Sequence, residues 1–549
     1  MTTGAPAALR CSGVAAGLWA LLLAWVLLSG TASAQEIERD SILWGFDNRC
    51  VVGRFNLLTL RVSNPTDTPV DKHLHLQRYI NGLPRGAVLV QRCYLSPGAR
   101  KTLQFHPFVV LAGESWYLSW AEGGAAPHTV IAQRDGPPAL VFLERIGEAN
   151  RRLRLPCFDP DLLPTSATAM DALRAVVIDR IPKLNGPRAK ALIEWVRGGG
   201  TVHQLLDDGR FRDFPPELAV LQPAEDVLHF GAGRVVRHAF ERGHLRRNFP
   251  KELAGGFPET GAEGYSATSW LRGALRSRIA SDHSWGVIFL LAVGYLLLVG
   301  PLFYRLSVRV LTWPVALLVL SVVVGLATWV FTIIGARGYG EGDSVHAVCC
   351  AHGIGDDQYD VIRYANVFTT RGVTRTIRGG DAFSLFSSAQ VQEQVNGQIR
   401  NGAGGSYAID MPRFSSRLVI QQNRVQGPKH GFAVTGGTAV LALPATSMIE
   451  IHDGIVDSWV PRGAGKWVRD RGKPVRSWLQ GSNLDQFEED TLRVVVRSRL
   501  LRKEQQLLAE PGRRVFFAVL QDSPKEFQLP LEGVAQRALT ILRFDPPND

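Results

Sequence analysis

Cysteine is scarce in this sequence, which has six in 549 residues, and one of the six, Cys11, lies within the first 34 residues. So low a content excludes the disulfide-dense scaffolds of small secreted domains. If the first 34 residues are removed, as argued below, an odd number of thiols remains, so at least one is unpaired or bonded to another chain. In an oxidising compartment Cys50 and Cys93, which lie in one strand-rich stretch, are the candidate disulfide.

The sequence also lacks any concentrated run of basic residues. Its formal net charge is +11, from 61 lysines and arginines against 50 acidic residues, and these cations are spread along the chain. A nucleic-acid-binding arm gathers its cations on one segment or face, so no nucleic-acid partner is predicted. A hydrophobic content of 46% and a charged content of 20% are typical of folded domains.

A phosphate-binding loop is missing as well. The segment 461–467 (PRGAGKW) has neither the first glycine of a P-loop at the required spacing nor a serine or threonine after Lys466. Those residues let the loop cradle phosphates and hold Mg²⁺. We therefore predict no nucleotide site there, and nothing else in the sequence indicates a cofactor.

What the sequence does contain is three apolar segments, of which the first is N-terminal. Arg10 precedes an apolar run over residues 14–28, and the small residues 32–34 (ASA) follow. This layout is typical of a secretory signal, here residues 1–34 with cleavage after Ala34. The run is too short to span a bilayer comfortably. An uncleaved anchor is the alternative, and both carry the rest of the chain across the membrane.

The second and third apolar segments, residues 286–304 and 310–336, contain no charged residue. At about 1.5 Å per residue, a helix over each could cross a hydrocarbon core of roughly 30 Å. Only residues 305–309 (RLSVR) separate them, so the two helices must form an antiparallel transmembrane hairpin within residues 285–336. The segments before and after the hairpin then lie on one side of the membrane, which the signal sequence places outside the cytoplasm.

Residues 35–136 show the alternation of apolar and polar residues that is typical of strands. In residues 55–67 (FNLLTLRVSNPTD), leucines and a valine alternate with polar residues before an Asn-Pro-Thr-Asp turn. Similar runs occupy residues 87–95, 101–111 and 116–120. Short strands at this spacing predict an antiparallel β-sandwich.

Residues 137–250 instead alternate strands with helices. Asn185 can cap a helix, the glycines at 198–200 can end it, and residues 201–206 (TVHQLL) are the next strand. This alternation predicts a parallel α/β sheet. Residues 251–284 are interpreted as a linker to the membrane.

A family resemblance follows from three segments, AVVIDR (175–180), AKALIEWVRGGGTV (189–202) and FGAGRVV (230–236). They resemble the class I glutamine-amidotransferase-like domains of bacterial membrane proteins, and YLLLVGPLFYRL (295–306) is similar to the first membrane helix of those proteins. The resemblance implies a flavodoxin-like domain over residues 137–250, preceded by a β-sandwich. It also implies a multi-pass protein of the bacterial cell (inner) membrane with most of its chain extracytoplasmic.

The catalytic part of that family's pattern is absent. An active amidotransferase needs a cysteine on a strained strand-to-helix elbow, together with a histidine and a glutamate. After the strand at 201–206 the chain continues as DDGRFRDFPPEL, without cysteine, serine or a Gly-x-nucleophile-x-Gly pattern. Cys157 ends an earlier strand and is followed by Phe-Asp-Pro, which is unlike an elbow. We therefore predict a pseudo-enzyme fold with no catalytic residue.

Residues 337–549 again show strand patterns and predict a second β-rich domain, with one amphipathic helix over about 484–508. Just after the second membrane helix, the segment HAVCCAH would place His346, Cys350 and His352 on one face of a strand. Imidazole and thiolate are ligands suited to zinc or copper, so these three are candidate metal ligands. No second metal-spaced pair lies nearby, which favours an ordinary structural role.

The predicted fold is thus multidomain, α/β plus all-β, and three functions follow from it. The leading hypothesis is a non-catalytic, membrane-anchored envelope protein whose outer lobes bind or scaffold other proteins, with the lipid bilayer and envelope proteins as partners. A ligand-sensing or transport-accessory subunit would bind a small molecule beyond the carboxyl ends of the parallel strands, near 157–159 or Asp179. A hydrolase would need a cysteine or serine within hydrogen-bond reach of a histidine in a cleft.

Overall fold

The computed structural model is mostly β-sheet, with few helices. The predicted signal segment, residues 1–34, lies outside the residues that the structure describes. These are residues 36–121, 128–131, 135–144, 156–245, 253, 262–279, 285–309, 312–338, 342–388, 391–452, 455–463, 465–470, 484–500 and 514–546.

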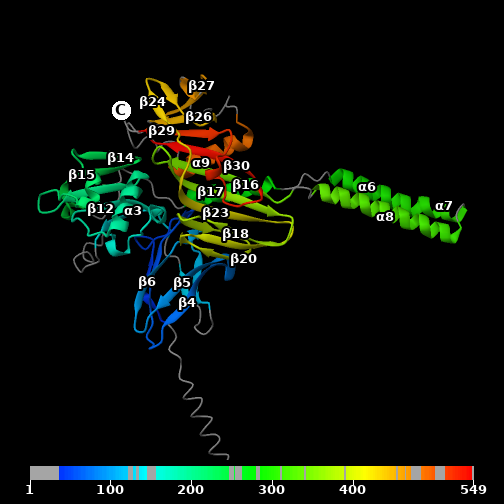
Figure 1. The fold of residues 1–549 in the computed structure, drawn as a ribbon, viewed down its shortest axis with the longest axis horizontal. Coiled ribbons are helices and arrows are strands. Elements are labelled where there is room, and N and C mark those ends of the chain that lie inside the picture. Colours follow the sequence, from blue (N-terminus) through cyan, green and yellow to red (C-terminus); the bar gives the residue numbers. More distant parts are fainter. Residues whose placement is uncertain are drawn as a thin grey trace, which may run out of the picture.

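Three β-containing regions pack together, and a pair of helices projects from them to one side (Figure 1). We call these the N-terminal β region (residues 36–131), the α/β region (135–245) and the C-terminal β region (342–546). The projecting pair is the helical hairpin (285–338).

The N-terminal β region forms two sheets around a shared core. Leu58, Leu60 and Val62 of its central strand are fully buried, as predicted, but Thr59 between them is only 2% exposed, so of the intervening polar residues only Arg61 faces outward. The smaller sheet is antiparallel and has the order β1(Glu36–Trp44), β3(Leu58–Ser63), β6(Arg100–Phe105). The larger sheet contains β4(Val70–Ile80), β5(Leu83–Leu95), β8(Ser115–Trp120) and β9(His128–Ile131), and a short ladder joins β2(Arg54–Phe55) to β7(Phe108–Val109).

The larger sheet continues into the C-terminal β region. Strand β5 pairs in parallel with β20(Gln394–Arg400), which is followed by β22(Ser406–Met411) and β18(Val373–Arg378) to complete seven strands. Side chains of both regions, among them Leu60 and Tyr407, are buried in one hydrophobic core. The segments 35–136 and 337–549, which the sequence presents as two domains, therefore fold as one body.

The rest of the C-terminal β region is a twelve-stranded sheet at the centre of the molecule (Figure 1). Helix α9(Gln486–Leu500) packs on one face through Leu492, Val495 and Val496. It begins two residues after the predicted start, and residues 501–508 of the predicted helix lie outside the described residues. The strand order is β21(Gly402–Ala403), β19(Phe383–Ser387), β23(Ser415–Gln426), β17(Gln358–Thr369), β16(Ser344–Gly353), β30(Ala535–Phe544), β29(Arg514–Leu520), β26(Ala445–His452), β27(Ile455–Pro461), β28(Lys466–Asp470), β25(Thr438–Val440), β24(Ala433–Thr435).

The α/β region is a six-stranded sheet, parallel except for one edge strand, with a helix on one face. Asn185 caps α3(Gly186–Arg197) by accepting a hydrogen bond from the Arg188 amide at 3.1 Å, which confirms the predicted helix start. Gly199, at φ +115°, ends the helix as predicted. The strand order is β11(Cys157–Phe158), β10(Ala139–Leu143), β12(Leu173–Ile178), β13(Thr201–Leu206), β15(Gly233–Glu241), β14(Val227–Phe230).

The helical hairpin contains two stretches that are long and apolar enough to cross a membrane. They span Gly286–Arg309 and Trp313–Thr332, each with a mean hydropathy of 2.4. Large apolar side chains such as Phe289 and Leu290 are more than 70% exposed in the protein alone. Soluble proteins rarely expose a contiguous apolar surface of this kind, so the hairpin fits a lipid environment.

The predicted connection at 305–309 is wrong. The first helix continues through it, as α6(Trp285–Leu297), a π-helical turn over Leu298–Leu302 and α7(Phe303–Arg309). The π turn contains Pro301, which has no N–H to donate within the helix. Arginines end an apolar segment without ending a helix, so charge marks the membrane boundary rather than the turn. The second helix, α8, covers Trp313–Gly338.

The predicted linker at 251–284 contains a docked helix, α5(Ala262–Ser277). Leu271 and Leu275 of this helix are at most 2% exposed and pack in the same cluster as Val348 and Ile362 of the twelve-stranded sheet. Trp270 stacks on Phe487 at the start of α9, with ring centroids 6.4 Å apart. The hairpin is thus held to one sheet at both ends, by α5 before it and by β16 after it.

The predicted disulfide is not formed, because Cys50 and Cys93 are both free and buried. Cys50 lies in a loop where it forms an isolated bridge with Asp135, whereas Cys93 lies within β5. Burial raises the pKa of Cys50 to about 12 and also raises the pKa of Cys93. Both thiols therefore remain protonated at neutral pH, as apolar core groups.

Candidate functional site: a cavity between the α/β region and the twelve-stranded sheet

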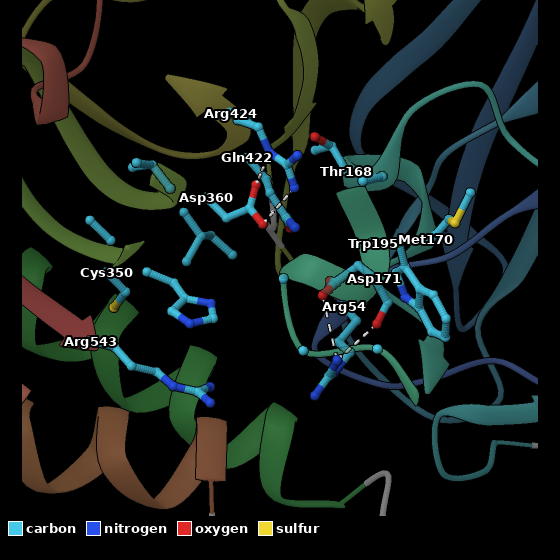
Figure 2. Close-up of a pocket in the computed structure, with 18 of the residues that line it drawn as sticks. Arg54, Thr168, Met170, Asp171, Trp195, Cys350, Asp360, Gln422, Arg424 and Arg543 are labelled. Atoms are coloured by element: carbon cyan, nitrogen blue, oxygen red, sulfur yellow. Dashed lines mark hydrogen bonds and ion pairs between the residues drawn. The ribbon is translucent and has the colours of Figure 1, made fainter. Parts of the chain in front are cut away.

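A cavity of about 410 Å³ lies between the α/β region and the twelve-stranded sheet (Figure 2). Its size is near the lower end of the range for ligand pockets, roughly 300–1,000 Å³. The α/β side contributes the segment before β12 and the end of α3. The sheet side contributes residues of β16, β17, β23 and β30. The polar side chains that line it are Arg54, Thr168, Asp171, Arg174, Thr201, Cys350, His352, Asp360, Gln422, Arg424 and Arg543.

The cavity is at the amino end of the parallel strands. Pro138 precedes β10, Leu173 is the first residue of β12, and Gly200 precedes β13, and all three line the cavity. Ligands of open α/β sheets usually bind beyond the carboxyl ends of the strands. This cavity is therefore distinct from the ligand position that the sequence pattern suggests.

The three glycines at the end of α3 form one wall. The amide of Gly198 donates to the Glu194 carbonyl at 3.1 Å, and the amides of Gly199 and Gly200 donate to Val196 and Trp195 at 2.9 and 3.0 Å. Since these amides are used within the helix end, they do not form an anion-binding nest. The carboxyl end of a helix carries partial negative charge, so this wall favours a cation.

Arg424 is the cation beside that wall, and it joins the two regions. Its Nε and Nη2 atoms donate to the Asp360 carboxylate at 2.7 and 3.0 Å, and its Nη1 atom donates to Glu194 at 2.9 Å. Burial lowers the pKa of Arg424, but the two carboxylates outweigh burial and raise it. Asp360 lies on β17 and Glu194 on α3, so the arginine holds the α/β region against the sheet.

A second polar group centres on Asp545, just after β30. Its carboxylate lies 2.7 Å from Nε2 of His352, accepts a hydrogen bond from Nη2 of Arg543 at 3.0 Å, and forms an ion-pair contact with Nε of Arg543 at 2.9 Å. Burial and the charge of Arg543 lower the pKa of His352 despite the nearby Asp545. The imidazole is therefore neutral near pH 7, and one of its nitrogens is already occupied.

The predicted metal-ligand trio is not brought together. Cys350 and His352 line the cavity, but His346 is six residues before His352 on the extended strand β16, roughly 20 Å away at about 3.3 Å per residue. Ligand atoms of one zinc ion lie about 2.0–2.3 Å from it, so His346 and His352 cannot share an ion. The strand period put the three residues on one face, but the rise along the strand separates them.

The carboxyl end of the parallel sheet, where the sequence suggested a ligand, carries a neutralised arginine. Arg242 contacts Glu144 at 2.5 Å and Asp179 at 2.8 Å, and its guanidinium lies 4.2 Å from the centre of the Phe142 ring. Burial raises the pKa of the neighbouring Cys157 thiol to about 11. Arg242 is therefore already paired with two carboxylates, and the Cys157 thiol stays protonated.

The position after β13, where an amidotransferase elbow would place its nucleophile, is a tight turn. The Asp207 amide donates to the Arg210 carbonyl at 2.9 Å, and Asp208 between them has a left-handed backbone, at φ +51°. The next helical element, a 3₁₀ turn, begins only at Pro216. No helix amino end is thus placed to support an anionic intermediate at Asp208, a carboxylate that is itself a weak nucleophile.

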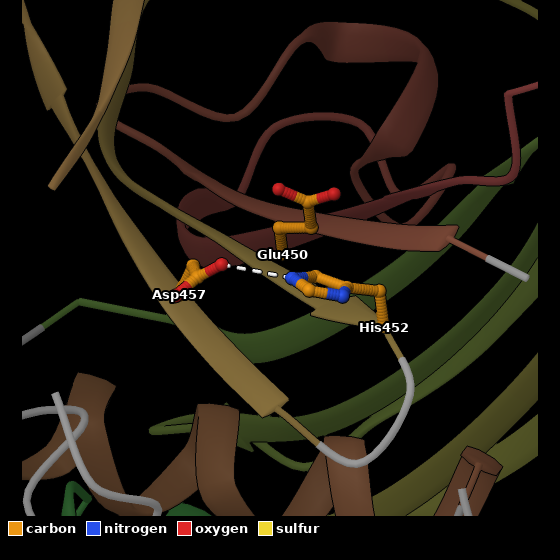
Figure 3. Close-up of side chains that lie close together, drawn as sticks. All are labelled: Glu450, His452 and Asp457. Carbon is orange, nitrogen blue, oxygen red and sulfur yellow. Dashed lines mark hydrogen bonds and ion pairs between the residues drawn. The ribbon is translucent and has the colours of Figure 1, made fainter. Parts of the chain in front are cut away.

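A cluster that the sequence analysis missed contains Glu450, His452 and Asp457 (Figure 3). Glu450 is directly opposite Asp457 on the paired strands β26 and β27, and both are 1% exposed. The atoms of Glu450, His452 and Asp457 that could bind a metal all lie within 4.8 Å of one another. The alternation Glu-Ile-His on one strand, followed by Asp on the return strand of a hairpin, was the signal available in the sequence.

Two arginines neutralise this cluster. Arg514 donates from Nε to Glu450 at 2.6 Å, and Arg469 is bonded to both Asp457 and His452. Two guanidinium groups thus balance two carboxylates, and a divalent cation would add uncompensated charge. The geometry therefore favours a buried ion-pair network over a metal site.

Two histidines on neighbouring strands of the α/β region share a hydrogen bond. Nδ1 of His203 on β13 lies 2.9 Å from Nε2 of His238 on β15, and His203 is 4% exposed. Burial, then the nearby charge of His238, lowers the pKa of His203 to about 3. Burial also lowers the pKa of His238. The pair is therefore neutral in the folded protein.

This pair is expected to make the protein less stable in acid. The unfolded chain binds a proton at His203 below pH 6.5, whereas the folded chain binds it only near pH 3. The free energy of unfolding therefore decreases as the pH is lowered from 6.5 toward 3. The replacement His203→Gln should lessen the slope by up to about 1.4 kcal/mol per pH unit. Thermal unfolding in detergent at several pH values between 7.5 and 4.5 measures it. The control is His229→Gln on the exposed part of β14; equal slopes in all three proteins would contradict the expectation.

Comparison with known proteins adds no family. No family model and no curated protein matches the chain. Among matching solved structures is a cycloisomaltooligosaccharide glucanotransferase of Paenibacillus sp. complexed with cycloisomaltoheptaose. It is 9% identical, with a TM-score of 0.18, over 71% of this chain and 70% of that chain. A likeness this weak carries no argument about fold or function.

Proposed function

We propose that this chain is a membrane-anchored protein of the bacterial envelope, whose folded regions lie outside the cytoplasm and bind other proteins without catalysis. The attachment of the helical hairpin at both ends carries the proposal. Helix α5, before the hairpin, packs on the twelve-stranded sheet, and β16, after it, is an inner strand of that sheet. A bilayer around the hairpin would therefore leave the whole folded body on one side.

Two features of the sequence support the outer side. The signal-like segment at 1–34 would carry the following residues across the membrane. Arg305 and Arg309 lie at the tip of the hairpin, and positive residues favour the cytoplasmic side. The tip would then be cytoplasmic and the protein would cross the inner membrane twice.

Two features of the α/β region support binding rather than catalysis. Its first four strands stand in the order second, first, third, fourth, as in flavodoxin-like sheets, which is consistent with the resemblance to amidotransferase-like domains. The elbow position holds Asp208 instead of a cysteine, and the Cys157 thiol on β11, three strands away in the sheet, is protonated. A scaffold of this kind retains surfaces for partners while lacking a nucleophile.

Labelling of single cysteines tests the arrangement in the membrane. Ser96→Cys in the N-terminal β region and Glu532→Cys in the C-terminal β region occupy exposed positions, and Ser307→Cys lies at the hairpin tip. A membrane-impermeant maleimide applied to spheroplasts should label the first two, and should label Ser307→Cys only after permeabilisation. The unsubstituted protein reports background labelling of the native thiols. Labelling of Ser96→Cys and Glu532→Cys from opposite sides would refute the proposal.

A separate assay tests the absence of catalysis. The full chain, purified in detergent, should release ammonia from glutamine no faster than buffer does. Cys157→Ser is the matched variant, because Cys157 is the half-buried thiol of the α/β region. A glutamine-dependent rate that disappears in Cys157→Ser would show that the domain is an enzyme.

One observation favours a second candidate, a ligand-sensing or transport-accessory role. The cavity of about 410 Å³ is lined by both regions. Strand β16 begins six residues after the second membrane helix and reaches the cavity at Cys350. A ligand in the cavity would thus contact the strand that is joined to the membrane.

A further inference from the structure

We infer that the cavity binds a small organic anion, with one anionic group held by Arg543 and His352 and an apolar body beside the hydrophobic lining. The inference rests on the ligand-binding candidate above and does not depend on which side of the membrane the cavity occupies. It is carried by the charge of the lining, the direction of Arg543, the second nitrogen of His352 and the apolar residues next to them.

Arginines outnumber carboxylates in the lining itself, while Glu194 and Asp545 just outside it pair with two of these arginines. Four arginines line the cavity, whereas only two carboxylates, Asp171 and Asp360, belong to the lining itself. Arg424 donates hydrogen bonds to Asp360 and Glu194, as described above, and Arg54 donates to the Asp171 carbonyl at 2.8 Å. Arg543 is paired with Asp545, a carboxylate outside the lining that also contacts His352.

Arg543 directs donors into the cavity. A guanidinium group has five N–H donors, and Arg543 directs Nε and Nη2 at Asp545. Figure 2 shows its guanidinium extending into the open space toward the wall that carries Arg54 and Asp171. An anionic group there could accept from Nη1 while the pair with Asp545 stays intact, so binding would not have to break an ion pair.

His352 supplies the second contact. Its Nε2 atom is at Asp545, which leaves Nδ1 to face a ligand. The charged groups around the ring are Asp545 and Arg543 near β30, Asp360 across the strand pair, and Arg424 bonded to Asp360.

An anion beside this ring would raise the pKa of His352 from its lowered value, so the imidazole would take up a proton as the ligand binds. Affinity should therefore increase as the pH falls from 7.5 to 6.0.

The apolar part of the lining limits the kind of anion. Pro138 and Ala167, which are half-buried, line the cavity on the α/β side, and Ile362 lines it on the sheet side. A strongly hydrated ion such as phosphate would leave this surface uncovered, whereas a carboxylate with a hydrocarbon or aromatic body would cover it. We therefore commit to a monocarboxylate and treat inorganic phosphate as the competing outcome.

Titration calorimetry on the full chain in detergent tests the inference with benzoate, hexanoate, benzamide and inorganic phosphate. Benzoate or hexanoate should bind, more tightly at pH 6.0 than at 7.5, and neutral benzamide should not. Arg543→Gln should weaken carboxylate binding about tenfold or more, the loss of one charge-assisted contact of about 1.4 kcal/mol or more. The matched control, Arg537→Gln, changes an exposed arginine of the same strand and should bind like the original protein.

Alkylation of Cys350 gives a readout that does not depend on a variant. This half-buried thiol lines the cavity, so bound benzoate should slow its reaction with iodoacetamide, followed by mass spectrometry. His352→Asn should retain some binding but lose the pH dependence. Equal binding of benzoate and benzamide, binding of phosphate alone, or no binding by any probe would overturn the inference. The labelling of Ser96→Cys and Glu532→Cys decides the proposed membrane arrangement separately.

Discussion

Replacing Glu450 by alanine is expected to destabilise the C-terminal β region by about 3–5 kcal/mol, because it removes one partner of a buried ion-pair network. Glu450 is 1% exposed, and its carboxylate accepts hydrogen bonds from Arg514 at 2.6 Å and from the Trp459 indole at 3.2 Å. Alanine would leave both donors without this acceptor, and the single remaining carboxylate, Asp457, would face two guanidinium groups.

The size of this effect can be measured by urea unfolding of the full chain in detergent. Glu450→Gln should lose less than Glu450→Ala, since an amide oxygen still accepts from the Trp459 indole. The matched control is Glu489→Ala, which removes a half-exposed partner of Arg493 at 2.8 Å on α9. Exposed helical pairs contribute about 0.3–0.5 kcal/mol, so this control should change little. Similar losses in Glu450→Ala and Glu489→Ala would contradict the network.

The same experiment separates the network from a metal centre. If Arg469 and Arg514 balance Glu450 and Asp457, neither zinc nor a chelator should change the unfolding midpoint of the original protein. A chelator-sensitive midpoint that becomes insensitive in Glu450→Ala would instead assign a metal to the three residues Glu450, His452 and Asp457.

The parts of the fold that could be predicted from the sequence depend on neighbouring residues. Burial of Leu58, Leu60 and Val62 follows from the two-residue period of a strand, and the cap at Asn185 needs only the three residues that follow it. The hairpin helices follow from apolar length alone. Each of these features depends only on residues within about one helical turn, one strand or one membrane helix of the sequence.

The parts that could not be predicted join distant segments. Strand β5 pairs with β20, about three hundred residues later in the chain. The Arg85 side chain at the start of β5 is likewise bonded to a carbonyl 307 positions away. Helix α5 has an unremarkable amphipathic sequence, and only the sheet that it covers makes it part of the core. Many strands of similar composition could have paired instead, so local patterns do not select the partner.

The candidate site shows the same division. The strand period correctly placed Cys350 and His352 on one face, where both line the cavity. The partner that fixes the role of His352 is Asp545, 193 positions away, and Arg424 reaches Glu194 across 230 positions. A site assembled between regions therefore has residues that can be suspected from sequence and a chemistry that depends on the packing.

Gly233→Ala is the other substitution with a large expected effect, because it would force the backbone of β15 away from α3. A Cβ atom at Gly233 would lie 1.9 Å from the Val196 carbonyl oxygen and 2.4 Å from the Gly200 carbonyl oxygen. Both are backbone atoms of the end of α3, which no side-chain rotation can move. The expected loss exceeds the roughly 1–3 kcal/mol typical of overpacking.

Limited proteolysis and thermal unfolding of the full chain in detergent would measure the loss. Gly273→Ala inside α5 is the control, since a Cβ there meets nothing within 4 Å, and alanine favours a helix interior over glycine by roughly 1 kcal/mol. The control should therefore melt at or above the original temperature, whereas Gly233→Ala should expose the α/β region to protease. Protection equal to that of Gly273→Ala would show that β15 and α3 are not packed as described.

The consequence for the cavity follows from the same geometry. Val196 and Gly200 belong to the helix end whose glycines form one cavity wall, and Glu194 in the last turn of that helix is bonded to Arg424 of the sheet. Displacing α3 by Gly233→Ala should therefore abolish benzoate binding, although residue 233 does not line the cavity. A variant that loses stability but binds benzoate at full affinity would place the ligand on the sheet side alone, with Arg543 and His352 sufficient to hold it.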